Sequence, residues 1–194
     1  MNSGRLEAFS DGVLAIIITI MVLEMKAPEE TTIEALIPSV PILSSYLISF
    51  IYIGTYWNNH HHLFQITEEV NGQVLWANLH LLFWLSLIPF ATSWVGENHI
   101  EALPVALYGF ILLMSGIAYS ILQNKIIQNH PEDFPLRQVV NGNRKEKLSL
   151  LLYLIGVLVS FVNPWVAILS YITVLIMWFI PDKQIENFFK INSG

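Results

Sequence analysis

The sequence predicts an all-α protein that crosses the membrane with six helices. Of its 194 residues, 54% are hydrophobic and only 12% are charged, whereas a soluble domain carries about 25% charged residues. The mean hydropathy is +0.56, and the apolar residues form runs long enough to span a bilayer, which takes about 20 helical residues. These spans use most of the chain, so we expect a single transmembrane domain over residues 1–194.

The first span is expected at residues 5–25. It begins with polar residues that include Arg5 and Asp11, and it holds no charge over residues 12–23. A cleaved signal peptide has a basic start and a small-x-small cleavage site. Here one basic residue precedes the run, acids lie in its first turns, and no such site comes before Glu24. We therefore expect a retained helix.

Polar connectors separate the other five spans. Pro38 and Pro41 precede the second span, and Asn163-Pro164 divides the last long apolar run. Proline at the first helical position after an asparagine cap is a helix start signal, which predicts a helical hairpin at this point. The five spans are expected at roughly residues 39–65, 74–95, 103–127, 147–163 and 164–181.

Lysine and arginine are unevenly distributed between the two sides of the predicted bundle. Eight of the nine basic residues fall on one side, and only Lys26 falls on the other. Cytoplasmic connectors are enriched in Lys and Arg, so we expect both termini in the cytoplasm and the chain in the cell (inner or plasma) membrane. The eight basic residues are Arg5, Lys125, Arg137, Arg144, Lys145, Lys147, Lys183 and Lys190, and the opposite side carries Glu24, Glu29, Glu30, Glu34, Glu97 and Glu101.

Asp11 is the first candidate functional residue, because a carboxylate inside a spanning helix is costly. Arg5 lies six residues earlier, about 600° around a helix, so the two side chains point to different faces. Each is expected to find a partner on another helix, in a polar cluster that ties the first three helices together. The alternative is that both side chains are interfacial and solvated. Candidate partners at the same depth are Asn58, His60, His61, His62, Asn78 and His80.

The three adjacent histidines at residues 60–62 raise the question of a metal site. Consecutive helical residues point about 100° apart, so three neighbours cannot all ligate one ion. No structural metal is therefore expected, and one or two of these histidines are expected to hydrogen-bond to Asp11 or its neighbours. Histidine titrates near neutrality in many surroundings, which leaves pH modulation open.

The apolar part of the first helix carries a stripe formed by Ile16, Ile20 and Leu23 at i, i+4, i+7. Thr19 lies beside it. Such residues commonly face lipid or core. However, the polar start would hold this helix inside the bundle, and the helix ends at Glu24, near an acidic outer surface. An interior helix with an acid-rich outer mouth suits a cation path, and apolar rings gate such paths by dewetting.

The sequence lacks the motifs that mark several classes of function. The sequence shows no nucleophile elbow, P-loop or GxGxxG, so we expect no enzyme activity, no cofactor and no nucleic-acid partner. It also lacks TVGYG and any run of regularly spaced arginines, so neither a carbonyl filter nor a voltage sensor is expected. Two alternatives stay open: a non-conducting membrane scaffold, and a small secondary transporter, for which Pro89 is the main mid-span signal.

The run Arg5-x-x-x-Phe9-Ser10-Asp11, followed by Gly-Val-Leu-Ala-Ile16, resembles the signature of one known family. That family is the bacterial branch of the transmembrane protein 175 potassium channels. The similarity continues through Trp57-Asn-Asn-His-His-His-Leu-Phe64 and from Trp76-Ala-Asn78 to Thr92. The last three spans match only in hydropathy.

The resemblance implies a homotetramer around a central pore that the first helix lines, since this chain carries one six-span unit. It implies conduction of K⁺ in preference to other monovalent cations, through isoleucine and leucine rings in place of a carbonyl filter. Carried over by position, the constriction is Ile16, Ile20 and Leu23, with Thr19 as a polar ring. The resemblance also implies that Arg5, Phe9, Ser10 and Asp11 anchor the first helix, and it adds Trp57 to the candidate partners.

Overall fold

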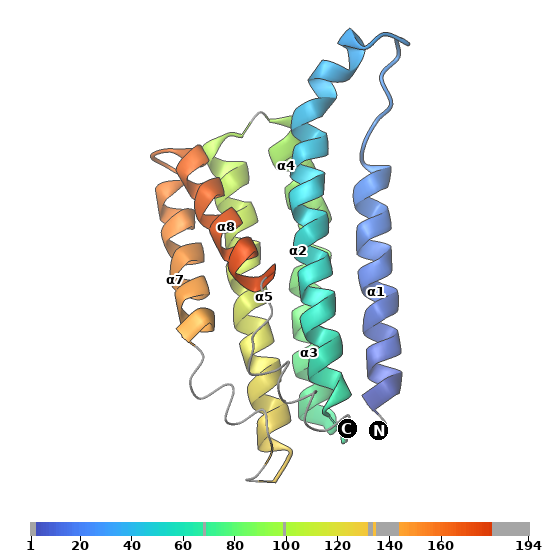
Figure 1. Cartoon of the computed structure of the whole chain (residues 1–194), viewed down its shortest axis with the longest axis vertical. Coiled ribbons are helices and arrows are strands. Elements are labelled where there is room, and N and C mark those ends of the chain that lie inside the picture. Colours follow the sequence, from blue (N-terminus) through green and yellow to red (C-terminus); the bar gives the residue numbers. More distant parts are fainter. Residues whose placement is uncertain (1–2, 68, 99, 132–133, 135–143, 180–194) are drawn as a thin grey trace.

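The computed structural model describes residues 3–67, 69–98, 100–131, 134 and 144–179. These residues form a bundle of roughly parallel and antiparallel helices (Figure 1), which confirms the predicted all-α class. The helices are α1 (Ser3–Leu23), the 3-10 helix η1 (Glu34–Ser39), α2 (Val40–Gln65), α3 (Gly72–Ser86), α4 (Ile88–Glu97), α5 (Ala102–Gln128), α7 (Arg144–Val159) and α8 (Pro164–Phe179).

The third predicted span is two helices, α3 and α4, that meet at Leu87. Pro89 lies in the first turn of α4. Proline has no backbone N–H, and its ring interferes with the preceding turn of a helix, so a helix ends or kinks before it. The break is confined to one residue: the Leu87 N–H donates to Trp84 O, and the Ala91 N–H donates to Leu87 O. The span is therefore kinked and not unwound.

Four helical segments among the described residues are long and apolar enough to cross a membrane. They are α1, the continuous segment of η1 and α2, the α3–α4 pair, and α5. The helices α7 and α8 are 16 residues each, which is shorter than the roughly 20 residues of a full crossing. All six predicted spans are thus helical, although the last two are short, and the end expected for the sixth at residue 181 lies outside the described residues.

The turn between α7 and α8 has the geometry that its sequence predicts. Asn163 caps α8, since its side-chain Oδ1 accepts from the backbone N–H of Trp165 at 3.0 Å and of Val166 at 3.4 Å. Pro164 opens the helix. The chain reverses here, so the two short helices pack against each other as a hairpin, as predicted.

The helix α5 forms the centre of the bundle. It packs on α3 and α4 on one side and on α7 and α8 on the other, and Figure 1 shows it between these groups. Its buried residues face in all directions and include Leu112, Leu122 and Ile126, each 0% exposed. A helix that is apolar on every side belongs in a core, and α5 occupies that position.

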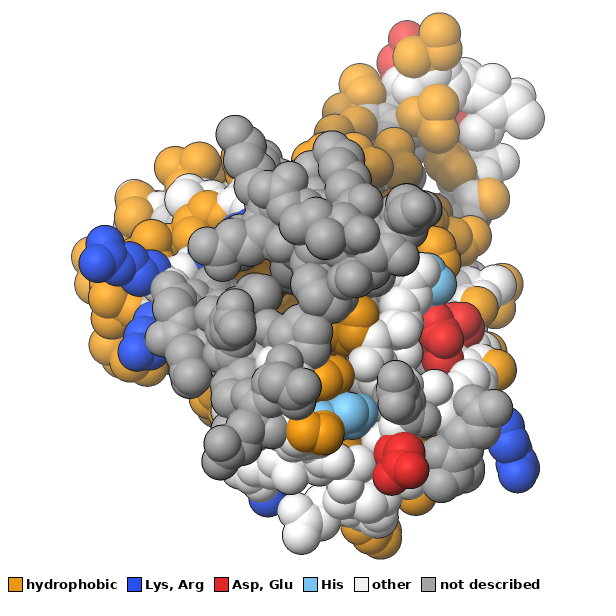
Figure 2. Space-filling model, turned by 60° about the horizontal axis from the view of Figure 1, so that its bottom comes forward, with side chains coloured by type: hydrophobic (Ala, Val, Ile, Leu, Met, Phe, Trp, Pro, Cys, Tyr) orange, Lys and Arg blue, Asp and Glu red, His pale blue; other side chains and the backbone are white. Residues whose placement is uncertain are grey.

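The helix α1 lies at the edge of the bundle and packs on α2, α3 and α4 (Figure 1). Its start lies beside the end of α2, because Glu7 contacts His61. Figure 2 turns this end of the bundle toward the viewer and shows acidic, basic and histidine side chains on it. The polar start of α1 is therefore part of a charged end of the molecule, and its apolar part runs along the side.

Candidate functional site

The helix α1 has a buried face and an exposed face. The buried residues, spaced by three or four, pack against the neighbouring helices; they are Leu6, Ser10, Leu14, Ile17 and Met21. The candidate constriction residues lie on the other face: Ile16 is 59% exposed, Ile20 is 41% exposed and Leu23 is 78% exposed. Thr19 is exposed too, and its hydroxyl donates to the Ala15 carbonyl one turn earlier. All four side chains project away from their own chain.

A buried chain of hydrogen bonds joins α1 to α3 and α2. The Ser10 hydroxyl donates to Leu6 O at 2.9 Å, and its oxygen accepts from Asn78 Nδ2 at 2.9 Å. Asn78 Oδ1 in turn lies 2.8 Å from His60 Nε2. Ser10 and Asn78 are fully buried, and His60 is 1% exposed. Because the links from Asn78 to Ser10 and to His60 cross between helices, the chain fixes the depth at which α1 sits against its neighbours.

The same chain assigns the proton on His60. Asn78 uses its amide N–H on Ser10, so its Oδ1 is the acceptor and the His60 Nε2–H is the donor. The assignment rests on the hydrogen-bond network, as it must for any histidine or amide side chain. His60 Nδ1 is buried and has no partner among the described residues. Its ring packs on Phe64, with the ring centroids 4.5 Å apart.

A second pair of contacts joins α1 to α2 nearer the surface. Trp57 Nε1 donates to Asp11 Oδ1 at 3.0 Å, and His61 Nδ1 lies 2.6 Å from Glu7 Oε1. The Trp57 and His61 rings are stacked, with an angle of 19° between them. Gln65 Nε2 donates to His61 Nε2 at 2.8 Å, which leaves the Nδ1–H of His61 to donate to Glu7. Two residues one turn apart on α1, Glu7 and Asp11, thus contact two residues one turn apart on α2, His61 and Trp57.

Asp11 therefore contacts Trp57, and the histidines contact its neighbours. His61 meets Glu7, one turn earlier on α1, and His60 reaches Ser10 through Asn78. No group of three His, Asp or Glu side chains in the described part of the chain could hold a metal ion.

The other candidate partners have different contacts. Asn58 is exposed. His62 Nδ1 lies 3.3 Å from Gln65 Oε1 on its own helix. His80 Nε2 accepts from Trp84 Nε1 at 2.9 Å, one turn along α3. These three side chains are not brought to Asp11.

The two remaining motif residues lie on the exposed side of α1. Phe9 is 52% exposed and Arg5 is exposed. They share this side with Ile16, because Phe9 is seven residues before it and Arg5 is eleven before it, close to two and three whole turns. Within one chain, the motif thus splits into an inward part, Ser10 and Asp11, and an outward part, Arg5 and Phe9.

Glu7 is a contact residue that the sequence reasoning missed. It lies four residues before Asp11, and residues four apart share a helix face. Trp57 and His61 have the same spacing on α2. Two pairs at i, i+4 on antiparallel helices form a recognisable ladder, and this spacing is the signal that could have identified Glu7.

Comparison with known proteins gives consistent matches. The sequence profile of a family described as endosomal/lysosomal potassium channel TMEM175 matches residues 5–89. The chain is 55% identical over 192 residues to a protein of Chryseobacterium sp. (strain P1-3) that is named a potassium channel, covering 99% of this chain and 100% of that one. It is 29% identical over 183 residues to a protein of Chamaesiphon minutus with the same kind of name, covering 86% and 88%.

The fold matches a solved structure as well. The structure resembles the crystal structure of a lysosomal potassium-selective channel TMEM175 homolog from Chamaesiphon minutus, with a TM-score of 0.79 and 28% sequence identity. The match covers 91% of this chain and 95% of that chain. Residues 5–89 include α1 from Arg5 onward and every α1 contact to α2 and α3 described above.

Proposed function

The chain belongs to the TMEM175 family of potassium channels, and on that basis we propose that it forms a potassium-preferring cation channel with a pore lined by α1. The family consists of ion channels and not of enzymes. The proposed activity needs no cofactor, because the permeant ion is the only ligand that conduction requires.

The observation that carries the proposal is the division of α1 into two faces. Polar contacts at Ser10 and Asp11 hold one face against α2 and α3. The opposite face presents Ile16, Ile20 and Leu23, all exposed in the single chain. One helix at the edge of a bundle encloses no path, so the pore in this proposal is formed by four copies whose α1 helices surround a common axis.

The proposed constriction is a stack of apolar rings. A helix rises about 1.5 Å per residue, so rings at Ile16, Ile20 and Leu23 follow one another at about 6 Å and about 4.5 Å along the axis. Such rings exclude water from a narrow pore and so set a barrier to ions. Thr19 donates its hydroxyl proton to Ala15 O, which leaves the oxygen lone pairs as the polar group of its ring.

The proposed orientation places both termini in the cytoplasm of a cell with the chain in its plasma membrane. Arg5 at the start of α1, Lys125 at the end of α5 and Arg144 at the start of α7 support it, whereas Lys26 follows the other end of α1. Three basic residues of the orientation argument, Arg137, Lys183 and Lys190, lie outside the described residues.

The kink between α3 and α4 does not favour a transporter. Discontinuous transporter helices expose unwound backbone to their substrates. Leu87 keeps helical dihedral angles, with φ −86° and ψ −11°, and the backbone hydrogen bonds continue across it. No second function is therefore proposed.

Ion flux into liposomes tests the proposal. Purified protein should pass K⁺ down its gradient, and Ile16→Asn or Leu23→Ser should raise the flux or change the K⁺ to Na⁺ ratio, because each wets the constriction. Val22→Ser is the matched control, since Val22 is 42% exposed on α1 but lies about 120° away from Ile16 around the helix. A folded oligomer without K⁺ flux, or stripe variants that behave like the control, would contradict the proposal.

A further inference from the structure

An apolar groove lies among α2, α4, α5 and α8, at the end of the bundle where α2 and α8 begin. The polar start of α1 is at the other end, beside the end of α2. The volume of the groove is about 350 Å³. Its walls are mainly apolar and include Ile48 of α2, Val95 of α4, Val105 of α5 and Ile168 of α8.

The hydroxyl groups in the lining are already hydrogen-bonded within the chain. Ser44 and Ser45 donate to carbonyl oxygens of the preceding turn of α2, at 2.8 Å and 2.9 Å. The Tyr171 hydroxyl donates to a carbonyl oxygen of α5 at 3.3 Å, and the Tyr108 hydroxyl lies 2.9 Å from Ser49 Oγ. Because these hydroxyls are paired inside the chain, a dry, apolar occupant fits the groove better than a polar one.

Two backbone features hold the shape of the groove. A Cβ at Gly96 would lie 2.7 Å from Ser45 Oγ and 2.8 Å from Ile42 Cα, so glycine lets α4 pack directly on α2. Ile100 lines the groove from the loop between α4 and α5 and has a φ of 64°, a conformation that β-branched residues rarely adopt. Such outliers persist where the surrounding structure holds them, and ligand clamps are among those places. The groove is therefore a preformed feature of the bundle.

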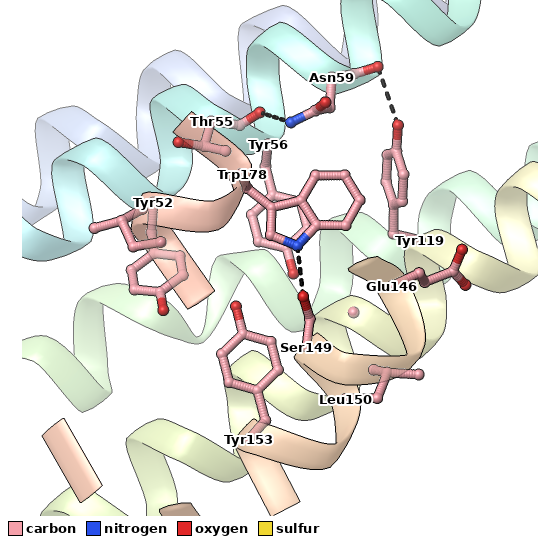
Figure 3. Close-up of a pocket in the computed structure, with 12 residues that line it drawn as sticks. Tyr52, Thr55, Tyr56, Asn59, Tyr119, Glu146, Ser149, Leu150, Tyr153 and Trp178 are labelled. Atoms are coloured by element: carbon pink, nitrogen blue, oxygen red, sulfur yellow. Dashed lines mark hydrogen bonds between the residues drawn. The ribbon is translucent and has the colours of Figure 1, made fainter. Parts of the chain in front are cut away.

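A layer of four tyrosine rings closes the inner side of the groove. Tyr108 and Tyr171 line the groove, with ring centroids 6.2 Å apart. Tyr52 and Tyr153 pack on them, with centroids 6.5 Å from Tyr108 and 6.3 Å from Tyr171 respectively. This second pair lines a smaller pocket of about 40 Å³ among α2, α5, α7 and α8, which Gly116 also lines (Figure 3). An occupant of the groove therefore rests on packed rings.

The groove faces lipid and is turned away from the proposed pore. Three of its four elements belong to segments long and apolar enough to cross a membrane, and α8 is a shorter apolar helix. Ile48 is nine residues before Trp57, about 180° around α2, and Trp57 contacts Asp11 of α1. The groove is thus on the side of α2 opposite α1, where hydrocarbon chains surround a membrane protein.

We propose that the groove binds one acyl chain of a phospholipid whose headgroup is zwitterionic. A dry apolar cavity of about 150 Å³ holds a benzene molecule, so about 350 Å³ has room for about 14 carbon atoms, which is most of one acyl chain. Trp165 lines the groove at the start of α8 and is 62% exposed. Tryptophan favours the boundary between hydrocarbon and headgroups, so the chain enters beside Trp165 and extends along α8 toward Ile172.

The charges near the groove select the headgroup. Glu97 and Glu101 are exposed, and they flank Ile100 in the sequence. The sequence has no Lys or Arg in residues 27–124 or 148–182, so the segments that line the groove offer no cation to an anionic headgroup. The two carboxylates instead attract the ammonium of phosphatidylcholine or phosphatidylethanolamine.

The test is lipid retention by the full chain, measured by native mass spectrometry after purification with equal phosphatidylcholine and phosphatidylglycerol. The wild type should retain phosphatidylcholine and release phosphatidylglycerol. Ile168→Trp narrows the groove from α8 and Ser44→Phe narrows it from α2, so both variants should lose the retained lipid. Leu169→Trp and Leu43→Phe are the matched controls and should keep it, because Leu169 and Leu43 are 62% and 55% exposed beside these positions and do not line the groove.

A second arm locates the bound chain with a phosphatidylcholine that carries a diazirine on one acyl chain. Labelling of the wild type should be stronger in residues 40–48 and 165–172 than on the exposed residues of α7, and Ile168→Trp should lose this excess. Equal retention by Ile168→Trp and Leu169→Trp, or phosphatidylglycerol retained as well as phosphatidylcholine, would overturn the proposal. Loss of the oligomer in both groove variants but in neither control would also overturn it and make a second copy the occupant. A chain that retains the lipid but passes no K⁺ contradicts only the proposed pore.

Discussion

The change Asn78→Ala tests how α1 is held in the bundle. Asn78 is 0% exposed and connects α3 to both neighbours, through Ser10 Oγ at 2.9 Å and His60 Nε2 at 2.8 Å. Alanine removes both hydrogen bonds at once. It also leaves the buried His60 N–H without an acceptor.

The expected loss of stability follows from these contacts. Side-chain hydrogen bonds between membrane helices contribute about 0.6 kcal/mol on average and up to about 1.7 kcal/mol each. An unsatisfied buried donor costs about 1–3 kcal/mol more. We therefore expect Asn78→Ala to lower the free energy of unfolding by about 2–4 kcal/mol. For a chain of this size that corresponds to a fall of about 4–16 °C in Tm.

The assay is thermal or denaturant unfolding of the purified protein in detergent, with size-exclusion chromatography to follow the oligomer. Asn58→Ala is the matched control, because Asn58 is an exposed asparagine on α2 and should change stability by less than about 0.5 kcal/mol. A double-mutant cycle with Ser10→Ala should give a coupling energy of at least about 0.5 kcal/mol. Equal stability of Asn78→Ala and Asn58→Ala would refute the reasoning.

Two further predictions concern other contacts of the bundle. Gly109→Ala should lower the free energy of unfolding by about 1–3 kcal/mol, because the new Cβ would lie 1.9 Å from the hydroxyl oxygen of the buried Tyr171. Gly54→Ala is the control: its Cβ would meet nothing within 4 Å, so the free energy of unfolding should be unchanged or higher by up to about 1 kcal/mol. Unfolding measurements on both variants check this prediction. Asp11→Ala and Trp57→Phe remove the same hydrogen bond, so each should lower the free energy of unfolding by about 1 kcal/mol and reduce the oligomer yield. The K⁺ to Na⁺ ratio measured by liposome flux should stay unchanged. A shifted ratio would instead make Asp11 part of the ion path.

Some features could be predicted because they depend on neighbours in the sequence. Asn163 and Pro164 form a cap from residues within three positions of each other, so the hairpin could be placed from the sequence. The break at Leu87 is explained by Pro89, but the sequence predicts one span over residues 74–95 there. Proline is tolerated in membrane helices, and its effect depends on the surrounding packing.

The partners of the polar residues could not be predicted. Depth alone left six candidates for Asp11, and the resemblance added Trp57 as a seventh without ranking them. In the structure Asp11 contacts Trp57, while His61 contacts Glu7. Depth follows from hydropathy, but the rotation of one helix against another depends on how their side chains interdigitate. A rotation of α2 about its axis by about 100°, the angle between consecutive helical residues, would have presented a different member of the histidine triplet to α1.

The sequence by itself determined which segments are helical, which are the most apolar and which residues of α1 share a face, because these depend on transfer free energy and on 3.6-residue periodicity. It also separated Asp11 from Arg5, six residues earlier. Only the tertiary structure decided that Ser10 faces inward to Asn78 and that Ile16, Ile20 and Leu23 face out of the chain. The physical reason is that periodicity groups residues on a helix face, but only the packing of other helices decides whether that face is buried or exposed. The pocket lined by Gly116 likewise exists only where α2, α5, α7 and α8 meet, and the sequence does not place these four helices together.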